Sequence, residues 1–230
     1  MSRRPVTATA PRPVRYAGPR TGWPVPVALI ALSVIPLVAG GLRLLQLAGG
    51  PGVMPADERF ADFPAPLFVH ILGAALYVVV GAFQFVPGFR RRHLDWHRRT
   101  GRVLAVAGLL VAGSALWMTI LYAQKPGTGE LLFVLRLFFG IAMAACLVLG
   151  VSAARARDIR AHRAWMIRAY AIGLAAGTQV FTEGIGGAVL GTGELRGDLA
   201  KGAGWVINLA VAEWAIGRRT SSADNRPARL

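Results

Sequence analysis

The chain has 230 residues, of which 54% are hydrophobic, and a formal net charge of +15. A charge of this size can indicate nucleic-acid binding. Here, however, the basic residues lie between long apolar runs, which excludes a soluble basic surface and nucleic acid as a partner. The single cysteine, Cys146, lies inside an apolar run, so the sequence has no disulfide framework and no cysteine-rich metal site.

Apolar runs of roughly the ~20 residues that a helix needs to cross a bilayer recur along the chain. In chain order they are predicted at residues 24–48, 65–88, 101–123, 131–152, 166–190 and 200–216. The first run lacks a clear cleavage site, so we expect it to be retained as a span. The sequence therefore predicts an all-α integral membrane bundle of six transmembrane helices within residues 24–217. The Pro- and Arg-rich arm 1–23 and the tail 218–230 are expected to be disordered.

The gaps between these predicted spans alternate in charge. Arginines are frequent in residues 1–23, in 89–102, in 153–168 and in the tail, whereas 49–64, 124–130 and 191–199 carry acidic residues and few cations. Because cytoplasmic segments carry an excess of Lys and Arg, the N and C termini are both predicted to be cytoplasmic. Membrane lipids are the expected partners, with anionic headgroups at the cytoplasmic arginine clusters.

Polar residues within the predicted spans form a candidate ligand pocket in the outer half of the membrane. An ionisable side chain at the centre of a span costs roughly 2.5–3.5 kcal/mol on insertion scales, so it usually faces the bundle interior. Two interpretations stay open: a pocket in which Glu183 pairs with Arg136 and His70 responds to protons, or a structural layer whose arginines reach the outer surface. The candidate residues are His70, Arg136, Glu183, Arg43, Gln179 and Gln84.

A second candidate site lies at the cytoplasmic ends of the third and fifth spans, where two histidines each open an Arg-rich block. If these spans are neighbours, the histidines could ligate a single b-type haem whose propionates pair with the arginines. The same cluster could bind a phospholipid headgroup. It is equally open that the arginines only set the topology. The candidate residues are His97, His162, Arg98, Arg102, Arg163 and Arg168; no metal ligand set is predicted.

Four blocks of this sequence resemble the DUF2306 family of predicted bacterial membrane proteins. They are Phe68-Val69-His70-Ile71, Gly81-Ala82-Phe83-Gln84-Phe85, His97-Arg98 with Gly101-Arg102, and His162-Arg163-Ala164-Trp165-Met166-Ile167-Arg168-Ala169-Tyr170. The resemblance covers roughly residues 65 to 190 and implies a multi-pass helical protein of the bacterial cytoplasmic membrane. It implies no activity. The layout is also similar to that of six-span cytochrome b561, although His70 would face Arg136 instead of a second histidine.

No hydrolase or transferase motif is present, so three classes of function remain. The first is a redox or haem-binding protein that uses the cytoplasmic histidines. The second is a small-molecule or proton transporter that uses the outer pocket. The third is a membrane scaffold in which the polar residues only hold the bundle together.

Overall fold

The computed structural model describes residues 22–224, and within this part of the chain all regular structure is helical. The elements are α1 (Pro24–Leu47), a short 3-10 helix η1 (Glu58–Phe60), α2 (Ala65–Phe83), α3 (Pro87–Arg92), α4 (Leu94–Leu121), α5 (Glu130–Arg155), α6 (Ile159–Gly173), α7 (Ala175–Leu190) and α8 (Glu194–Asp224). The expected arm 1–23 lies almost wholly outside the described residues. Helix α8 runs into the segment that was expected to be a disordered tail, and residues 225–230 are not described.

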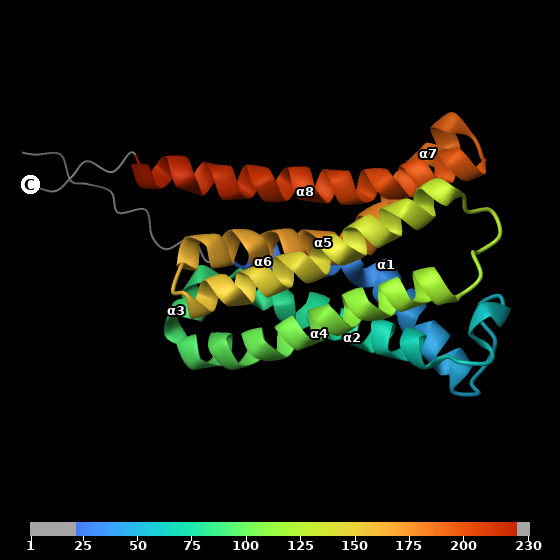
Figure 1. Ribbon diagram of the computed structural model, residues 1–230, viewed down its shortest axis with the longest axis horizontal. Coiled ribbons are helices and arrows are strands. Elements are labelled where there is room, and N and C mark those ends of the chain that lie inside the picture. The colour runs from blue at the N-terminus through green and yellow to red at the C-terminus, as the bar shows by residue number, and fades with distance from the viewer. Residues whose placement is uncertain (1–21, 225–230) are drawn as a thin grey trace, which may run out of the picture.

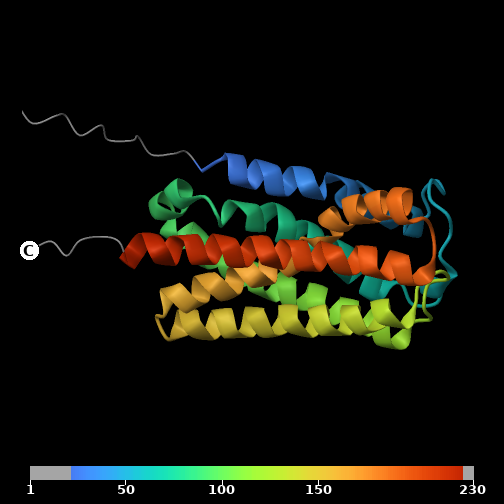
Figure 2. The same cartoon turned by 90° about the horizontal axis from the view of Figure 1, so that it is seen from above.

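The long helices lie side by side in one bundle, and the two described ends of the chain lie at the same end of it (Figures 1 and 2). Along the chain, α1 packs on α2, α2 on α4, α4 on α5 and α5 on α6. The bundle is completed by α8, which contacts α5, α6 and α7, and by α7, which contacts α1. The loops at one end carry the short helix α3 and the α5–α6 turn; those at the other carry η1.

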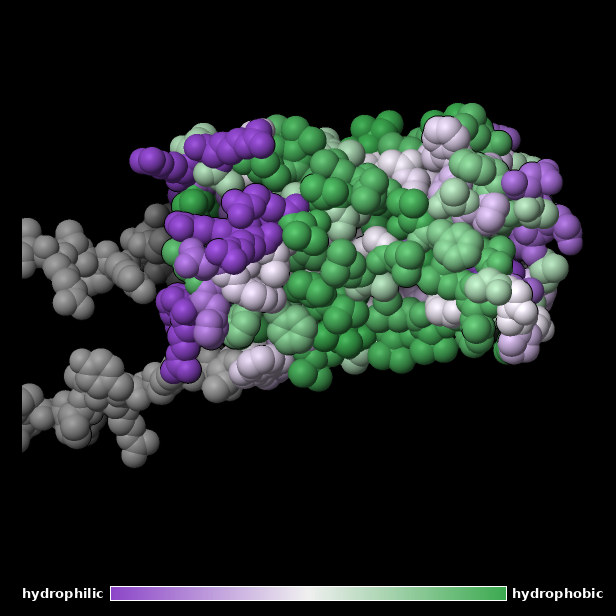
Figure 3. Space-filling model, turned by 90° about the horizontal axis from the view of Figure 1, so that it is seen from below, coloured by the Kyte–Doolittle hydropathy of each residue, from purple (hydrophilic) through white to green (hydrophobic). Residues whose placement is uncertain are grey.

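Four helices of the described chain are long and apolar enough to cross a membrane: α1, α2, α4 and α5. They match the first four predicted spans. The face of the bundle shown in Figure 3 is apolar between its two ends, and hydrophilic residues on this face gather most densely at the end that holds α3 and the α5–α6 turn. Side chains such as Val106, Ile141 and Val189 are more than half exposed on this surface. A soluble monomer rarely exposes so much contiguous apolar surface, so the belt is suited to lipid.

The packed core occupies the half of the bundle on the α3 side. Tyr170 of α6 donates from its hydroxyl to the Val78 carbonyl of α2 at 2.7 Å, and Leu147 of α5 is fully buried. Gly81 makes this packing possible, because a Cβ at that position would lie 2.7 Å from the Tyr170 ring. Gly81 itself is buried at this contact.

The fifth predicted span is divided at Leu174, between α6 and α7. Asn208 of α8 joins the two parts: its Nδ2 donates to the Ala171 carbonyl at 3.1 Å, and its Oδ1 accepts from the Thr178 hydroxyl at 2.7 Å. On the α6 side of the break the chain packs against α5 and α2, and on the α7 side it packs against α1. Residues at the break border a space that is also bounded by α2, α4 and α5.

Candidate functional site

A cavity of about 370 Å³ occupies that space. Its walls come from α2, α4, α5, the α6–α7 junction and α8, and η1 contributes Arg59 and Phe60 at the loop end. Three of the predicted pocket residues line it, namely His70, Arg136 and Gln179. Most of the remaining wall is apolar. The volume is in the range of small-molecule sites, which are mostly apolar with a few convergent polar groups.

Arg136, on the second turn of α5, is the cavity cation without a protein counterion. Within residues 22–224 its guanidinium makes no hydrogen bond or ion pair, and its side chain is partly buried. The charges that act on it from beyond contact distance are those of Arg59, Asp198 and Glu183. An arginine carries five N–H donors in a planar fork that suits a carboxylate or phosphate. Arg136 therefore carries N–H donors suited to an anion that no described residue uses.

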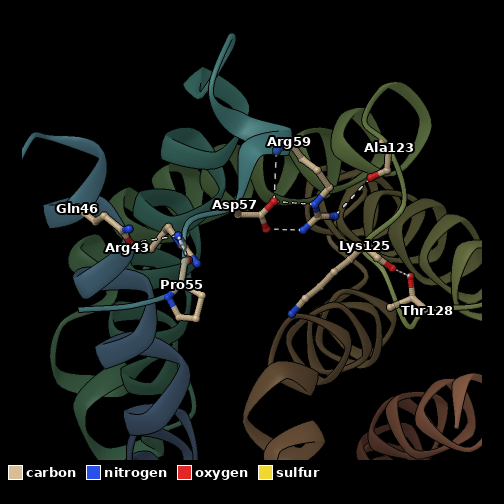
Figure 4. Close-up of polar contacts among 8 residues, drawn as sticks. All are labelled: Arg43, Gln46, Pro55, Asp57, Arg59, Ala123, Lys125 and Thr128. Atoms are coloured by element: carbon tan, nitrogen blue, oxygen red, sulfur yellow. Dashed lines mark hydrogen bonds and ion pairs between the residues drawn. The ribbon is translucent and has the colours of Figure 1, made fainter. Parts of the chain in front are cut away.

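Arg59 of η1 lines the cavity and is held by polar contacts with Asp57 and Ala123 (Figure 4). Its Nε and Nη2 donate to the two oxygens of Asp57 at 2.8 and 2.6 Å, and its Nη1 donates to the Ala123 carbonyl at 3.4 Å. The hydrogen bonds from Arg59 lower the pKa of the Asp57 carboxyl below its usual value. A small second pocket of about 20 Å³ is also lined by Arg59 and Arg136 and continues the cavity toward the loop that follows α4.

Lys201 of α8 also lines the cavity, and it pairs with Glu183 of α7 across 2.8 Å. This differs from the predicted Glu183–Arg136 pair. The reason is the helix arrangement: α7 and α8 pack against each other, whereas Arg136 stands on α5. Glu183 itself does not line the cavity. Its role in the described structure is to neutralise a second cavity cation.

His70 and Gln179 supply the uncharged polar groups of the cavity. The His70 Nδ1 lies 3.2 Å from the Val111 carbonyl and 3.2 Å from the Ser114 hydroxyl of α4. The Gln179 Nε2 donates to the Lys201 carbonyl at 3.0 Å. His70 thus bonds to α4 and also forms part of the cavity wall.

Asp198 is buried beside this site and is used structurally. Its carboxylate accepts from the Leu132 N–H at 3.0 Å and from the Gly129 N–H at 3.0 Å, which are free donors at the start of α5. A carboxylate there satisfies backbone donors and favours the positive end of the helix dipole. Because Asp198 is occupied in this way, it is not a contact partner for Arg136.

Two residues of the predicted outer layer lie outside the cavity. Arg43 donates from Nη1 to Gln46 Oε1 at 3.1 Å and to the Pro55 carbonyl at 3.0 Å, so it ties the loop after α1 to that helix (Figure 4). Gln84 follows α2 at the opposite end of the bundle, where its Nε2 donates to the Thr100 hydroxyl at 2.7 Å. The sequence placed all six candidate residues in one pocket, but it did not reveal where along the helices a cavity opens.

The two histidines predicted to lie on the cytoplasmic side, His97 and His162, lie at one end of the bundle, close enough for the charge of His162 to act on His97. His162 Nδ1 donates to the Gly150 carbonyl at 2.8 Å, and His97 Nδ1 is buried without a hydrogen-bond partner among the described residues. Their helices α4 and α6 each pack on α5 and α2. The haem ligation predicted for this pair stays a prediction.

The arginines of this cluster differ in their surroundings. Arg168 is engaged by Glu213 of α8 through two hydrogen bonds of 2.6 and 2.9 Å, and its guanidinium lies 4.8 Å from the Trp165 ring centre. Arg98 and Arg102 are exposed on α4, and Arg163 on α6 is half-buried. Arg168 therefore has a structural partner that the sequence did not suggest, because Glu213 lies 45 positions away.

Sequence reasoning missed Arg59, Lys201 and Asp198. Arg59 and Asp198 lie in gaps between predicted spans and were counted there as loop residues, whereas Lys201 lies at the start of the predicted sixth span, 200–216. A usable signal existed for Lys201, because an ionisable side chain within a predicted span usually faces the bundle interior.

A family model described as a predicted membrane protein (DUF2306) matches residues 67–216 of the chain. This stretch contains all the cavity residues except those contributed by η1. No curated protein and no solved structure matches the chain.

Proposed function

The chain belongs to the DUF2306 family of predicted membrane proteins, and we propose that it binds a small organic anion in the cavity around Arg136 as the substrate site of a transporter in the bacterial cytoplasmic membrane. One observation carries the proposal: Arg136 lines a ligand-sized cavity with its guanidinium unpaired within the described residues.

The proposed topology has six crossings and cytoplasmic termini. In this arrangement the broken α6–α7 unit is the fifth crossing and α8 is the sixth. Support comes from the arginines, which cluster at the end of the bundle where the described chain begins and ends, and from the positive-inside rule. The cavity then opens on the outer side, and the cytoplasmic arginines contact anionic lipid headgroups.

The energetics of Arg136 favour a ligand over a purely structural role. An unpaired cation within a span costs roughly 2.5–3.5 kcal/mol on insertion scales. The neighbouring cations Arg59 and Lys201 each have a carboxylate partner within 3 Å. A scaffold would gain stability from a counterion or an apolar residue at position 136. An anionic ligand offsets the cost of the Arg136 charge only while it is bound. This cost in the ligand-free protein favours binding of an anion, as a binding site requires.

The helix break supports transport in particular. Discontinuous helices at mid-membrane depth are tolerated where they line a cavity or are buried in protein, and they recur at transporter binding sites. Here Gly173, Ala175 and Ala176 at the break form part of the cavity wall. A ligand at Arg136 would therefore contact the junction between two helical segments that pack on different neighbours.

Calorimetric titration of the purified full-length protein in a non-ionic detergent tests the binding proposal, with benzoate and inorganic phosphate as probes. We expect at least one of them to bind, and Arg136→Gln to weaken that binding about 10-fold or more, because a charge-assisted hydrogen bond is lost. Arg136→Lys, which keeps the charge, should retain part of the affinity. The matched control is Arg43→Gln, which removes an outer-half arginine that is outside the cavity.

The proposal is contradicted if neither probe binds the folded protein, or if Arg136→Gln binds both as well as the unmodified protein does.

The proposed topology is tested by cysteine labelling. After Cys146→Ser, a single cysteine at Thr128 should react with a membrane-impermeant maleimide added outside intact cells, and one at Ala156 should not. The opposite pattern would place the cavity on the cytoplasmic side.

A further inference from the structure

The charges of the cavity wall indicate the net charge of the ligand, which the volume of the cavity does not. Arg59 is neutralised by Asp57, Lys201 is neutralised by Glu183, and the Asp198 carboxylate is held by the backbone at the start of α5. One full positive charge is left over, on Arg136. A ligand with one negative charge balances the site, whereas a dianion would carry an uncompensated charge into a half-apolar cavity at considerable cost.

His70 adds a hydrogen-bond acceptor. A carbonyl oxygen can only accept, so the 3.2 Å contact to Val111 assigns the imidazole proton to Nδ1. The Ser114 hydroxyl donates its hydrogen bond to the Leu110 carbonyl at 2.6 Å, so its oxygen accepts from His70 Nδ1. The other ring nitrogen, Nε2, then carries a lone pair, and no described residue donates to it.

Gln179 adds a second acceptor. Its amide nitrogen is fixed by the Lys201 carbonyl at 3.0 Å, which leaves Oε1 as the group not used by that bond. Both side chains are part of the cavity wall. The uncharged polar groups of the cavity are thus suited to a hydroxyl or N–H on the ligand.

The rest of the wall is suited to an apolar body. Phe139 of α5 and Trp205 of α8 stack with their ring centroids 4.7 Å apart and their planes at 14°, and both line the cavity. Met143 and Ile172 line the part nearest the core. Burial of apolar ligand surface against such a wall contributes about 25 cal/mol per Å².

Building on the proposed anion site, we propose that its ligand is an amphipathic organic monoacid. Its carboxylate binds Arg136, its apolar body packs against Phe139, Trp205 and Met143, and a hydroxyl or N–H on that body donates to His70 Nε2 or Gln179 Oε1.

A series of four probes tests this class on the unmodified full-length protein: acetate, benzoate, 4-hydroxybenzoate and phenyl phosphate. Benzoate should bind about 10-fold or more tightly than acetate, because acetate has no apolar body. The hydroxyl of 4-hydroxybenzoate should improve on benzoate about 3-fold or more, the size of one net hydrogen bond. Phenyl phosphate, which carries close to two charges at neutral pH, should bind no tighter than benzoate.

The proposed ligand class is overturned if acetate equals benzoate, if the hydroxyl gives no gain, or if phenyl phosphate binds more tightly than benzoate. In any of these cases the proposal of an anion site at Arg136 is judged separately, by the variant Arg136→Gln. Loss of all binding in this variant would support the anion site although the ligand class is wrong, whereas binding that persists in it would refute the site. His70→Phe and Gln179→Met separate the two acceptors. One of them should abolish the advantage of 4-hydroxybenzoate while benzoate affinity is kept, and retention of the advantage in both would refute the hydroxyl contact.

Discussion

The Lys201 ammonium lies 2.8 Å from the Glu183 carboxylate, and this pair determines the charge of the cavity. It joins α7 to α8 and uses the carboxylate that the sequence suggested for Arg136. The consequence is a cavity in which Arg136, which one of the two interpretations paired with Glu183, has no counterion among the described residues.

Removal of the Glu183 charge should therefore change ligand preference. In Glu183→Gln the ammonium of Lys201 becomes a second uncompensated cation, and we expect the affinity for phenyl phosphate to rise about 5-fold or more relative to benzoate. Competition titration of the two probes measures this ratio. A variant that is only less stable, with the same ratio of affinities, would show that the pair has a structural role alone.

Asp198 should be a large contributor to stability although it touches no ligand. Asp198→Ala leaves the first N–H groups of α5 buried without acceptors, and we expect a loss of about 2 kcal/mol in the free energy of unfolding. Thermal unfolding in detergent measures the change. Asp62→Ala, at an exposed loop position, is the control and should have little effect. Equal destabilisation by both would contradict the assigned cap.

Gly81 should tolerate no side chain. A Cβ there would lie 2.7 Å from the Tyr170 ring, which is held in place by its hydrogen bond to Val78. We expect Gly81→Ala to cost about 1–3 kcal/mol, as overpacking of a core does. At Gly113 of α4 a Cβ meets nothing within 4 Å, so Gly113→Ala should be neutral or stabilising. The packing of α2 on α6 is refuted if the two substitutions have the same effect on thermal unfolding.

The loop that carries Arg59 should become less protected from hydrogen exchange at acidic pH. The pKa of Asp57 is lower in the folded protein than in a free chain, chiefly because Arg59 donates to it. The contribution of the pair is therefore complete above the ordinary pKa of about 4 and is lost as the pH falls through the lower folded value. Hydrogen exchange of residues 49–64 should show a drop in protection below about pH 4, corrected for the intrinsic rate. Asp57→Asn should lack this step, and a step of equal size in that variant would assign it to another group.

The sequence predicted the helices well and the side-chain partners poorly. Long apolar runs predicted α1, α2, α4 and α5, because length and composition decide whether a segment suits a bilayer. Their ends were predicted less well: α2 ends at Phe83 where the run was extended to residue 88, and α4 begins at Leu94 where the run was started at residue 101. The break at Leu174 was not predicted, since neither proline nor a polar run marks it. It becomes evident only with Asn208, which bonds on both sides of it from another helix.

The candidate site was predicted by residue type but not by pairing. His70 and Gln179, two of the predicted pocket residues, line the cavity. The sequence alone could not say which neighbour each helix face meets, so one of the two interpretations paired Glu183 with Arg136, whereas its partner is Lys201. For the same reason Gln84 was grouped with residues at the other end of the bundle. The place of Arg59 in the cavity wall could not be predicted for a different reason. Arg59 lies in the segment between α1 and α2, and such a connecting segment has no hydrophobic periodicity from which the direction of a side chain could be inferred.

Anomalous diffraction from crystals of the protein with 4-bromobenzoate tests the central claim most directly, because it locates both ends of a bound monoacid. The account predicts a bromine peak beside Phe139, Met143 and Trp205, with the carboxylate against the Arg136 guanidinium. A bromine peak confined to the arginine clusters around Arg98 and Arg163, or a cavity that stays empty at saturating ligand, would contradict it.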